Sequence, residues 1–193
     1  MERWIAPNLN VPLYPQKPNE MTCVPVCIKM VLEYLKSDYN PRPTPFPELS
    51  IDEIIKILKT DITFLGTSLK NIRNLNEDER VHIAVPSLEF EGRFGGTLDE
   101  IKKELANNRP VIVYVPLSET HTANRHAIVI TGIDEQNFLI RYNDPLFGAK
   151  CESIVKFQRQ WDIADHVIIT VKIGARKQRL IKDFYEIVGS GKK

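Results

Sequence analysis

Apolar residues recur at helical spacing directly after a polar, proline-containing loop near the N-terminus. In the segment PQKPNEMTCVPVCIKMVLEYL, residues 15–35, Thr22 can cap a helix that begins at Cys23. Pro25 is compatible with a first turn, whose amides have no partner within the helix. The residues that share one face of this helix are Cys23, Cys27, Met30, Val31, Tyr34 and Leu35. The pattern predicts a half-buried helix with Cys23 at the top of its buried face.

Capping boxes, in which a serine or threonine precedes a glutamate by three positions, predict two further helices. Ser50 and Glu53 form the first box, and apolar residues at helical spacing continue to about residue 59. Thr97 and Glu100 form the second box, which begins a helix that ends by residue 108. A shorter helix is expected just after residue 67, since its apolar residues also follow helical spacing.

Short apolar runs predict strands in much of the remaining chain. These runs cover residues 81–85, 111–115, 126–132, 138–142 and 167–173. Residues 1–14 are expected to form an extended arm with a short strand near 9–13, and residues 92–96 a mobile loop. Helices that come mainly before a run of strands predict an α+β fold.

The length and charge of the chain narrow its class. Its 193 residues suit one domain over residues 1–175, followed by a basic amphipathic helix and tail at 176–193. A formal net charge of +1, with both signs interspersed, argues against a nucleic-acid partner. The sequence shows neither a secretory signal nor a membrane segment of about 20 apolar residues, which predicts a soluble, cytoplasmic protein. Three cysteines without a disulfide framework fit a reducing compartment.

Four residues are candidates for nucleophilic chemistry. The positive end of a helix favours the thiolate form of Cys23, which is the nucleophilic form. Gln16, held between two prolines, can offer a carboxamide N–H to a developing oxyanion. His126 begins one apolar strand and Asp144 ends the next, so a hairpin that turns near residues 134–137 would make them neighbours.

The order of these residues resembles the papain-like cysteine peptidases. It is most similar to the bacteriocin-processing, double-glycine-leader peptidases of family thirty-nine and to their stand-alone relatives. The shared features are Gln16, Cys23 at a helix start, an apolar strand that opens on His126 and Ala127, and an Asn-Asp-Pro sequence around Asp144. The likeness runs from about residue 11 to residue 172, and it implies a papain-like fold in which a helical part with the cysteine packs on a mainly antiparallel sheet. The family usually has a glycine after the nucleophile, where this chain has Val24.

Each candidate also has a plainer interpretation. Cys23 could be a small buried apolar residue, and Cys27, one turn later, is expected to belong to the core. A metal site with both thiols lacks an evident fourth ligand. Asn143 is the rival of Asp144, since papain uses an asparagine there, but alternation along a strand allows only one of them to face His126.

Two further residues and one loop also have two possible interpretations. His121 could line the cleft or be solvated, and Trp161 could shield the histidine side of the cleft or pack in the core. The proline-rich loop at residues 40–47 could contribute to specificity or be a rigid connector. His82 and His166 are expected to be structural.

The resemblance implies a thiol-dependent peptidase with a catalytic triad of Cys23, His126 and Asp144 and an oxyanion donor in Gln16. Such chemistry requires no metal or organic cofactor, and its partner is a peptide or protein substrate. Two alternatives remain open. The same residues could transfer the acyl group to an amine, or the chain could be a papain-like module that binds a peptide without cutting it, which the presence of Val24 keeps in consideration.

Overall fold

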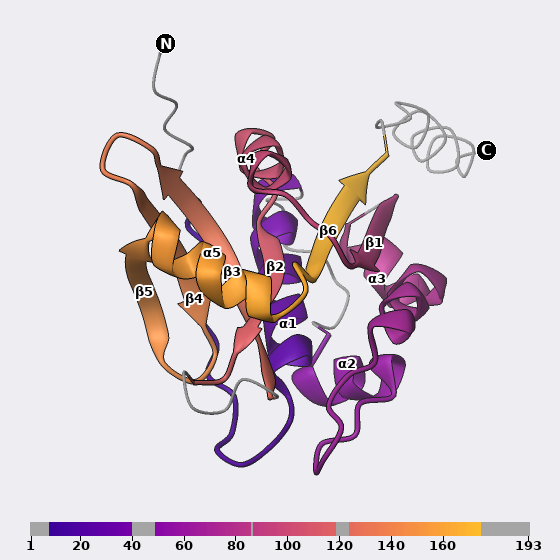
Figure 1. Ribbon diagram of the computed structural model, residues 1–193. Coiled ribbons are helices and arrows are strands. Elements are labelled where there is room, and N and C mark those ends of the chain that lie inside the picture. The colour runs from indigo at the N-terminus through magenta and orange to yellow at the C-terminus, as the bar shows by residue number, and fades with distance from the viewer. Residues whose placement is uncertain (1–7, 40–48, 86, 119–123, 175–193) are drawn as a thin grey trace, which may run out of the picture.

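One antiparallel sheet organises the chain, with strands in the order β1, β6, β2, β3, β4, β5. The computed structural model describes residues 8–39, 49–85, 87–118 and 124–174 (Figure 1). Within these ranges the strands are β1 (Leu88–Arg93), β2 (Val111–Pro116), β3 (Arg125–Asp134), β4 (Leu139–Asp144), β5 (Gly148–Ser153) and β6 (Ile168–Ile173). The helices are α1 (Cys23–Tyr39), α2 (Ile51–Leu58), the 3-10 helix η1 (Leu69–Glu77), α3 (Glu79–Ala84), α4 (Leu98–Ala106) and α5 (Ile154–Ile163).

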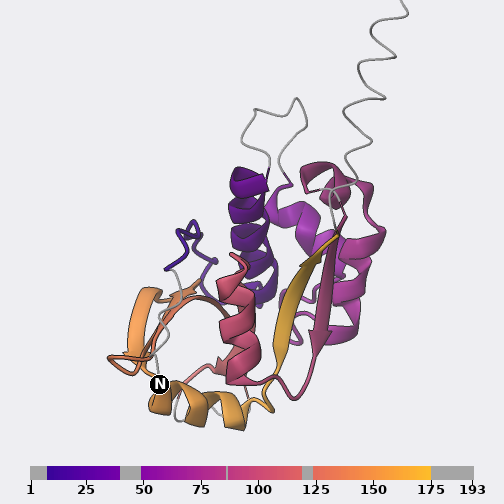
Figure 2. The ribbon, with the colours of Figure 1, turned by 90° about the horizontal axis from the view of Figure 1, so that it is seen from above.

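Helices cover both faces of the sheet. The long helix α1 packs against β3 and carries α2 on its other side, whereas α5 packs against β2 and the β4–β5 pair. Figures 1 and 2 show α1 and α5 on opposite faces, with α4 near the end of the sheet where β2 begins. The strands β2 and β3 are buried almost throughout because both of their faces are covered. The predicted α+β fold is therefore confirmed.

Several predicted elements form for the physical reasons that the sequence indicated. Helix α1 begins at Cys23, and the Thr22 carbonyl accepts the first helical hydrogen bond from the Val26 amide at 3.0 Å. Both bonds of the Ser50–Glu53 capping box are present at the start of α2. At the start of α4 the Thr97 side chain accepts from the Glu100 amide, as a cap should.

Other predictions were wrong. The segment 81–85 was predicted to be a strand but lies in and just after α3, because the Asp78 side chain caps this helix and the buried residues Val81 and Val85 are four positions apart. By contrast, the short helix expected after residue 67 does form, as the 3-10 helix η1. The strand near residues 9–13 is absent from the described arm, although Leu9 and Val11 are buried and the Leu9 amide donates to the Thr131 carbonyl.

Strand β1, strand β5 and helix α5 were not predicted. Gly92, expected in a mobile loop, lies in β1, where a side-chain carbon would come within 2.7 Å of Leu69 Cδ1. Strand β5 has no buried residue on either face, so it lacks an alternating pattern. The expected loop at 40–47, His121 and the C-terminal helix at 176–193 lie outside the described residues, and so do residues 1–7.

Candidate active site

The start of α1 and the open end of the β3–β4 hairpin meet at one end of the sheet. His126 is the second residue of β3 and Asp144 is the last residue of β4. His126 Nε2 lies 2.8 Å from Asp144 Oδ1, and both side chains are buried. The Asp144 carboxylate also accepts hydrogen bonds from the amides of Leu146 and Phe147 at 2.8 and 3.1 Å, which fix its orientation. The structure thus brings together the two residues that the sequence placed on adjacent strands.

Cys23, at the start of α1, is close enough to His126 for their side chains to form a hydrogen bond. Burial opposes a charged imidazole, but hydrogen bonding to Asp144 and to Cys23, with the negative charges of both groups, outweighs it and raises the pKa of His126 from 6.5 to about 9. Since Nε2 faces Asp144, the remaining ring nitrogen, Nδ1, is the one available to Cys23. The raised pKa therefore lets the imidazole hold a proton beside the Cys23 side chain at neutral pH.

Asn143 has a different role from Asp144. Its Nδ2 donates to the Val11 carbonyl at 2.8 Å, which ties the N-terminal arm to β4. The side chain is buried, and one of its two amide hydrogens is used in this bond. Of the two rival residues, Asp144 is the one that contacts His126.

Gln16 lies beside the hairpin end through its backbone. The Gln16 amide donates to the Pro145 carbonyl at 2.9 Å, directly after Asp144. Its side-chain Nε2 donates to the Glu20 carbonyl at 2.9 Å, so the carboxamide is held by its own loop. Because a carboxamide nitrogen carries two hydrogens, one N–H remains for another acceptor. The Oε1 atom is buried and has no hydrogen-bond partner among the described residues.

Cys27 is a core residue, as its position on α1 predicted. It is completely buried and its thiol donates to the Ala127 carbonyl at 3.4 Å. Burial raises the pKa of Cys27 well above its ordinary value, and the nearby charges of Cys23 and Asp144 act in the same direction. The neutral, buried thiol is therefore a poor nucleophile. Cys151 is exposed on β5.

Trp161 packs in the core and not over His126. It is buried, its indole N–H donates to the Val167 carbonyl at 3.0 Å, and its ring stacks on Phe157 and on His166. The aromatic ring that contacts His126 is Phe147, edge to face with ring centroids 6.4 Å apart. Phe147 was not among the residues predicted from the sequence, although its position three residues after Asp144 could have indicated it.

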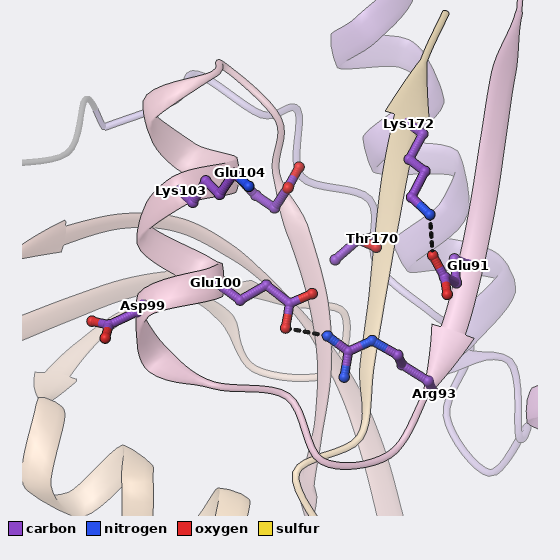
Figure 3. A pocket seen from close by; sticks show the side chains of 8 residues that line it. All are labelled: Glu91, Arg93, Asp99, Glu100, Lys103, Glu104, Thr170 and Lys172. Carbon is purple, nitrogen blue, oxygen red and sulfur yellow. Dashed lines mark hydrogen bonds and ion pairs between the residues drawn. The ribbon is translucent and has the colours of Figure 1, made fainter.

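The described part of the structure also has a hollow that contains none of the candidate catalytic residues. A hollow of about 490 Å³ lies between α4, β1 and β6, and its charged lining includes the ion pairs Arg93–Glu100 and Glu91–Lys172 (Figure 3). Within the described ranges, no three or more His, Cys, Asp or Glu side chains gather as a metal site would require. No helix of those ranges has the length and apolar character needed to cross a bilayer.

A known protein family matches most of the chain. A model of the Peptidase_C39 like family matches residues 8–169, so the chain belongs to that family, as the resemblance indicated. No curated protein matches the sequence.

Two solved structures share the fold. One, from Bacillus anthracis and described as a C39-like peptidase, has a TM-score of 0.62 at 16% identity, over 90% of this chain and 100% of the other. The second is a double glycine motif protease from an AMS/PCAT transporter in complex with the leader peptide. It has a TM-score of 0.55 at 17% identity, over 86% of this chain and 94% of the other.

Proposed function

We propose that this protein is a cysteine peptidase in which Cys23, His126 and Asp144 form the catalytic triad and Gln16 assists as an oxyanion donor. The observation that carries the proposal is that the buried His126 side chain hydrogen bonds both to the Asp144 carboxylate and to the Cys23 side chain. The three groups come from the start of α1, the start of β3 and the end of β4, which are fixed to one another by the sheet and its packing. A nucleophile, a base and a group that orients the base are the parts that covalent acyl transfer requires.

The proposed reaction proceeds in two stages. The thiolate of Cys23 attacks the peptide carbonyl carbon, and the electron pair of the carbonyl bond moves to its oxygen, which accepts hydrogen bonds from the free N–H of Gln16 and from the Cys23 amide. The oxyanion then collapses, the C–N bond breaks, and the His126 imidazolium gives its proton to the departing amine. Water, deprotonated by His126, next attacks the thioester and releases the carboxylic acid and the thiolate. Asp144 holds the imidazole in one orientation in both stages.

A peptide is the proposed substrate because a structurally similar protease was solved with a leader peptide bound. The family and the shared fold support the same class of reaction. The ring of Phe147 lies edge to face with the His126 imidazole, so Phe147 is proposed as a residue that positions His126.

A peptide-binding module without turnover is the second candidate, and Val24 is the observation that favours it. Val24 is buried in the first turn of α1, directly after the nucleophile, where the bulk of its side chain limits how the backbone can adjust. An acyltransferase would use the same residues with an amine in place of water.

Labelling with a thiol-reactive peptide probe, such as a peptidyl vinyl sulfone, distinguishes these candidates. The proposal expects modification of Cys23 and not of Cys27 or Cys151, identified by mass spectrometry, with loss of labelling in His126→Ala. Product analysis with and without an added amine acceptor then separates hydrolysis from transfer. Labelling that does not depend on His126, together with no cleavage of a peptide library, would reject the peptidase and leave the binding module.

A further inference from the structure

Strand β5 forms one border of the sheet, and its outer edge has no partner among the described residues (Figure 1). On its inner side β5 pairs with β4 along its whole length. On its outer side no backbone hydrogen bond joins it to another segment of the described ranges. A free strand edge presents a row of N–H and C=O groups to any chain that can pair with it.

The opposite border of the sheet is closed by a side chain. Asn76, in η1, donates from Nδ2 to the Phe90 carbonyl at 2.9 Å, and its Oδ1 accepts from the Phe90 amide at 2.7 Å. This carboxamide takes the place of a neighbouring strand at the outer edge of β1, whose inner edge pairs with β6. The described residues provide no such cover at the outer edge of β5.

The pairing of β5 with β4 determines which of its backbone groups face the open edge. The Ile154 amide donates to the Phe138 carbonyl at 2.9 Å, directly after the last pair of the ladder. Bonded and non-bonded pairs alternate along an antiparallel ladder, so the even-numbered residues of β5 also bond to β4. The N–H and C=O groups of Ala149 and Cys151 therefore point to the open edge, with Cys151 near the centre of the strand.

The charges of β5 allow the strand to complement itself. Lys150 directly precedes Cys151, and Glu152 directly follows it. When two β5 strands pair antiparallel with Cys151 at the centre, Lys150 of each copy lies opposite Glu152 of the other. These are non-bonded pairs, in which the two side chains lie closest. Lys150 is exposed and has no ion-pair partner among the described residues, whereas Glu152 lies 3.5 Å from Lys156 of its own copy.

The same arrangement brings together exposed apolar side chains at the two ends of the strand. Phe147, directly before β5, is 57% exposed, and Val155, in the first turn of α5, is 54% exposed. Both residues are four positions from Cys151, on opposite sides of it. Antiparallel pairing therefore places the Phe147 end of one copy beside the Val155 end of the other. Burial of this apolar surface adds to the backbone hydrogen bonds.

We propose that this protein forms a homodimer in which two β5 strands pair antiparallel about a twofold axis at Cys151, so that the two sheets become one. The backbone N–H and C=O of Cys151 in each copy then exchange hydrogen bonds. Such an interface uses the same patch on both copies and closes at two. A second copy is favoured over an unrelated peptide because the Lys-Cys-Glu order complements itself. The inference does not depend on the proposed peptidase function.

Gel filtration with light scattering tests the charge pairing. At about 200 μM chain, where even a small interface associates, we expect the wild type to be a dimer. Lys150→Glu places like charges opposite each other at both symmetric positions, so it should weaken dimerisation by about tenfold or more. The double variant Lys150→Glu/Glu152→Lys restores complementary pairs and should restore the dimer. Lys70→Glu, at an exposed position of η1, is the matched control for the change in net charge and should dimerise like the wild type.

A proline at the centre of the strand tests the backbone pairing separately. The Cys151 amide faces the open edge, so Cys151→Pro keeps the bonds to β4 and removes a donor from the interface. We expect Cys151→Pro to be monomeric, with a circular dichroism spectrum like that of the wild type, and Cys151→Ala to stay dimeric. A wild type that is monomeric at about 200 μM, or a dimer that neither Lys150→Glu nor Cys151→Pro weakens, would overturn the inference.

Oxidative cross-linking locates the axis. Cα atoms of a bonded antiparallel pair are about 5.5 Å apart, which is within the range that a disulfide spans. In Cys23→Ala protein, which keeps Cys151 and the buried Cys27, copper phenanthroline should produce a covalent dimer on a non-reducing gel. Adding Cys151→Ala should abolish this product, and adding Lys150→Glu should slow its formation by about tenfold. A dimer in solution that does not cross-link through Cys151 would place the interface elsewhere and overturn the inference.

Discussion

His126 Nε2 lies 2.8 Å from Asp144 Oδ1, in surroundings where each side chain is almost fully removed from water. This contact and the hydrogen bond with Cys23 together overcome the effect of burial and raise the pKa of His126 to about 9. A protonated imidazole at neutral pH is the state that the proposed peptidase needs before it attacks a substrate.

Replacing Asp144 with Asn should lower the upper pH limit of activity. If the active form pairs the thiolate with an imidazolium, the alkaline limb of kcat/KM in the wild type should fall near pH 9. The substituted carboxamide would carry no charge to stabilise the imidazolium, so the limb should move to lower pH, and kcat should fall by about 100-fold or more. The measurement is a pH–rate profile. Asn143→Ser is the control: it breaks the bond to the Val11 carbonyl, so it should reduce stability and leave the limb in place.

The stability of the folded chain should depend on the same group. The folded-state pKa of His126 is above the ordinary 6.5, so its contribution is fully present below about pH 6.5 and is lost as the pH rises through 9. The difference in unfolding free energy between the wild type and His126→Gln should therefore shrink over this range, by at most roughly 3 kcal/mol. Urea titrations between pH 6 and 9.5 give this difference. Desolvation opposes a charged His166, but its hydrogen bonds to Asp162 and Gly96 raise its pKa as well. Because His166 is present in both proteins, its contribution to the pH dependence cancels in the difference. A difference in unfolding free energy that stays constant with pH would contradict a raised pKa of His126 in the folded protein.

The cysteines of α1 should respond to substitution in opposite ways. Cys23→Ala removes the proposed nucleophile with a small change of volume, so turnover should be lost while the thermal unfolding temperature stays close to that of the wild type. Cys27→Ala should keep turnover but lose about 1 to 2 kcal/mol of stability, because it opens a small cavity and removes the bond to Ala127. Kinetics and denaturation of both variants check the contrast, with the exposed Cys151→Ala as the neutral control. Full turnover in Cys23→Ala would end the proposal.

Replacing Gln16 with Ala should affect turnover far more than substrate binding. Loss of one preorganised oxyanion donor typically lowers kcat by about 100- to 1,000-fold, with a small change in KM. Alkylation of Cys23 by small reagents should stay nearly unchanged, because that reaction forms no oxyanion. Gln136→Ala, at an exposed position of the β3–β4 turn, is the matched control. A fall in kcat of less than about threefold would remove Gln16 from the site.

Much of the helical part of the fold could be predicted because its signals are local. The capping box at Ser50 involves residues three positions apart and forms completely. At Thr97 the side chain accepts from the Glu100 amide as predicted, but the Glu100 carboxylate pairs with Arg93 and does not complete the box. The prediction of a strand at 81–85 was wrong because the apolar residues there also fit helical spacing. Val81 and Val85 are four positions apart, and both are buried. Strand β5 could not be predicted, since its residues depend on pairing with β4 and carry no buried face of their own.

The sequence by itself determined which residues could do the chemistry. It placed Cys23 at a helix start, and it placed His126 and Asp144 near the ends of consecutive apolar runs, because caps, prolines and periodicity act over a few residues. The strand pattern alone could not decide between Asn143 and Asp144, since alternation shows only that they face opposite sides of the sheet, and it was the family resemblance that favoured Asp144.

The tertiary structure decided between them through a β-bulge. From the turn, the β3–β4 register pairs Ile133 with Ile140 and Gly132 with Arg141, but it then shifts by one residue, so that Val129 pairs with Asn143. Without the shift, Asn143 would lie on the same face of the sheet as His126. With the shift, Asp144 lies on the face of His126 and Asn143 lies on the opposite face. The extra residue, Thr131, accepts a hydrogen bond from Leu9 in the N-terminal arm. Leu9 and Thr131 are 122 positions apart, so the register shift is accompanied by a long-range contact. No local pattern in the sequence can predict such a contact.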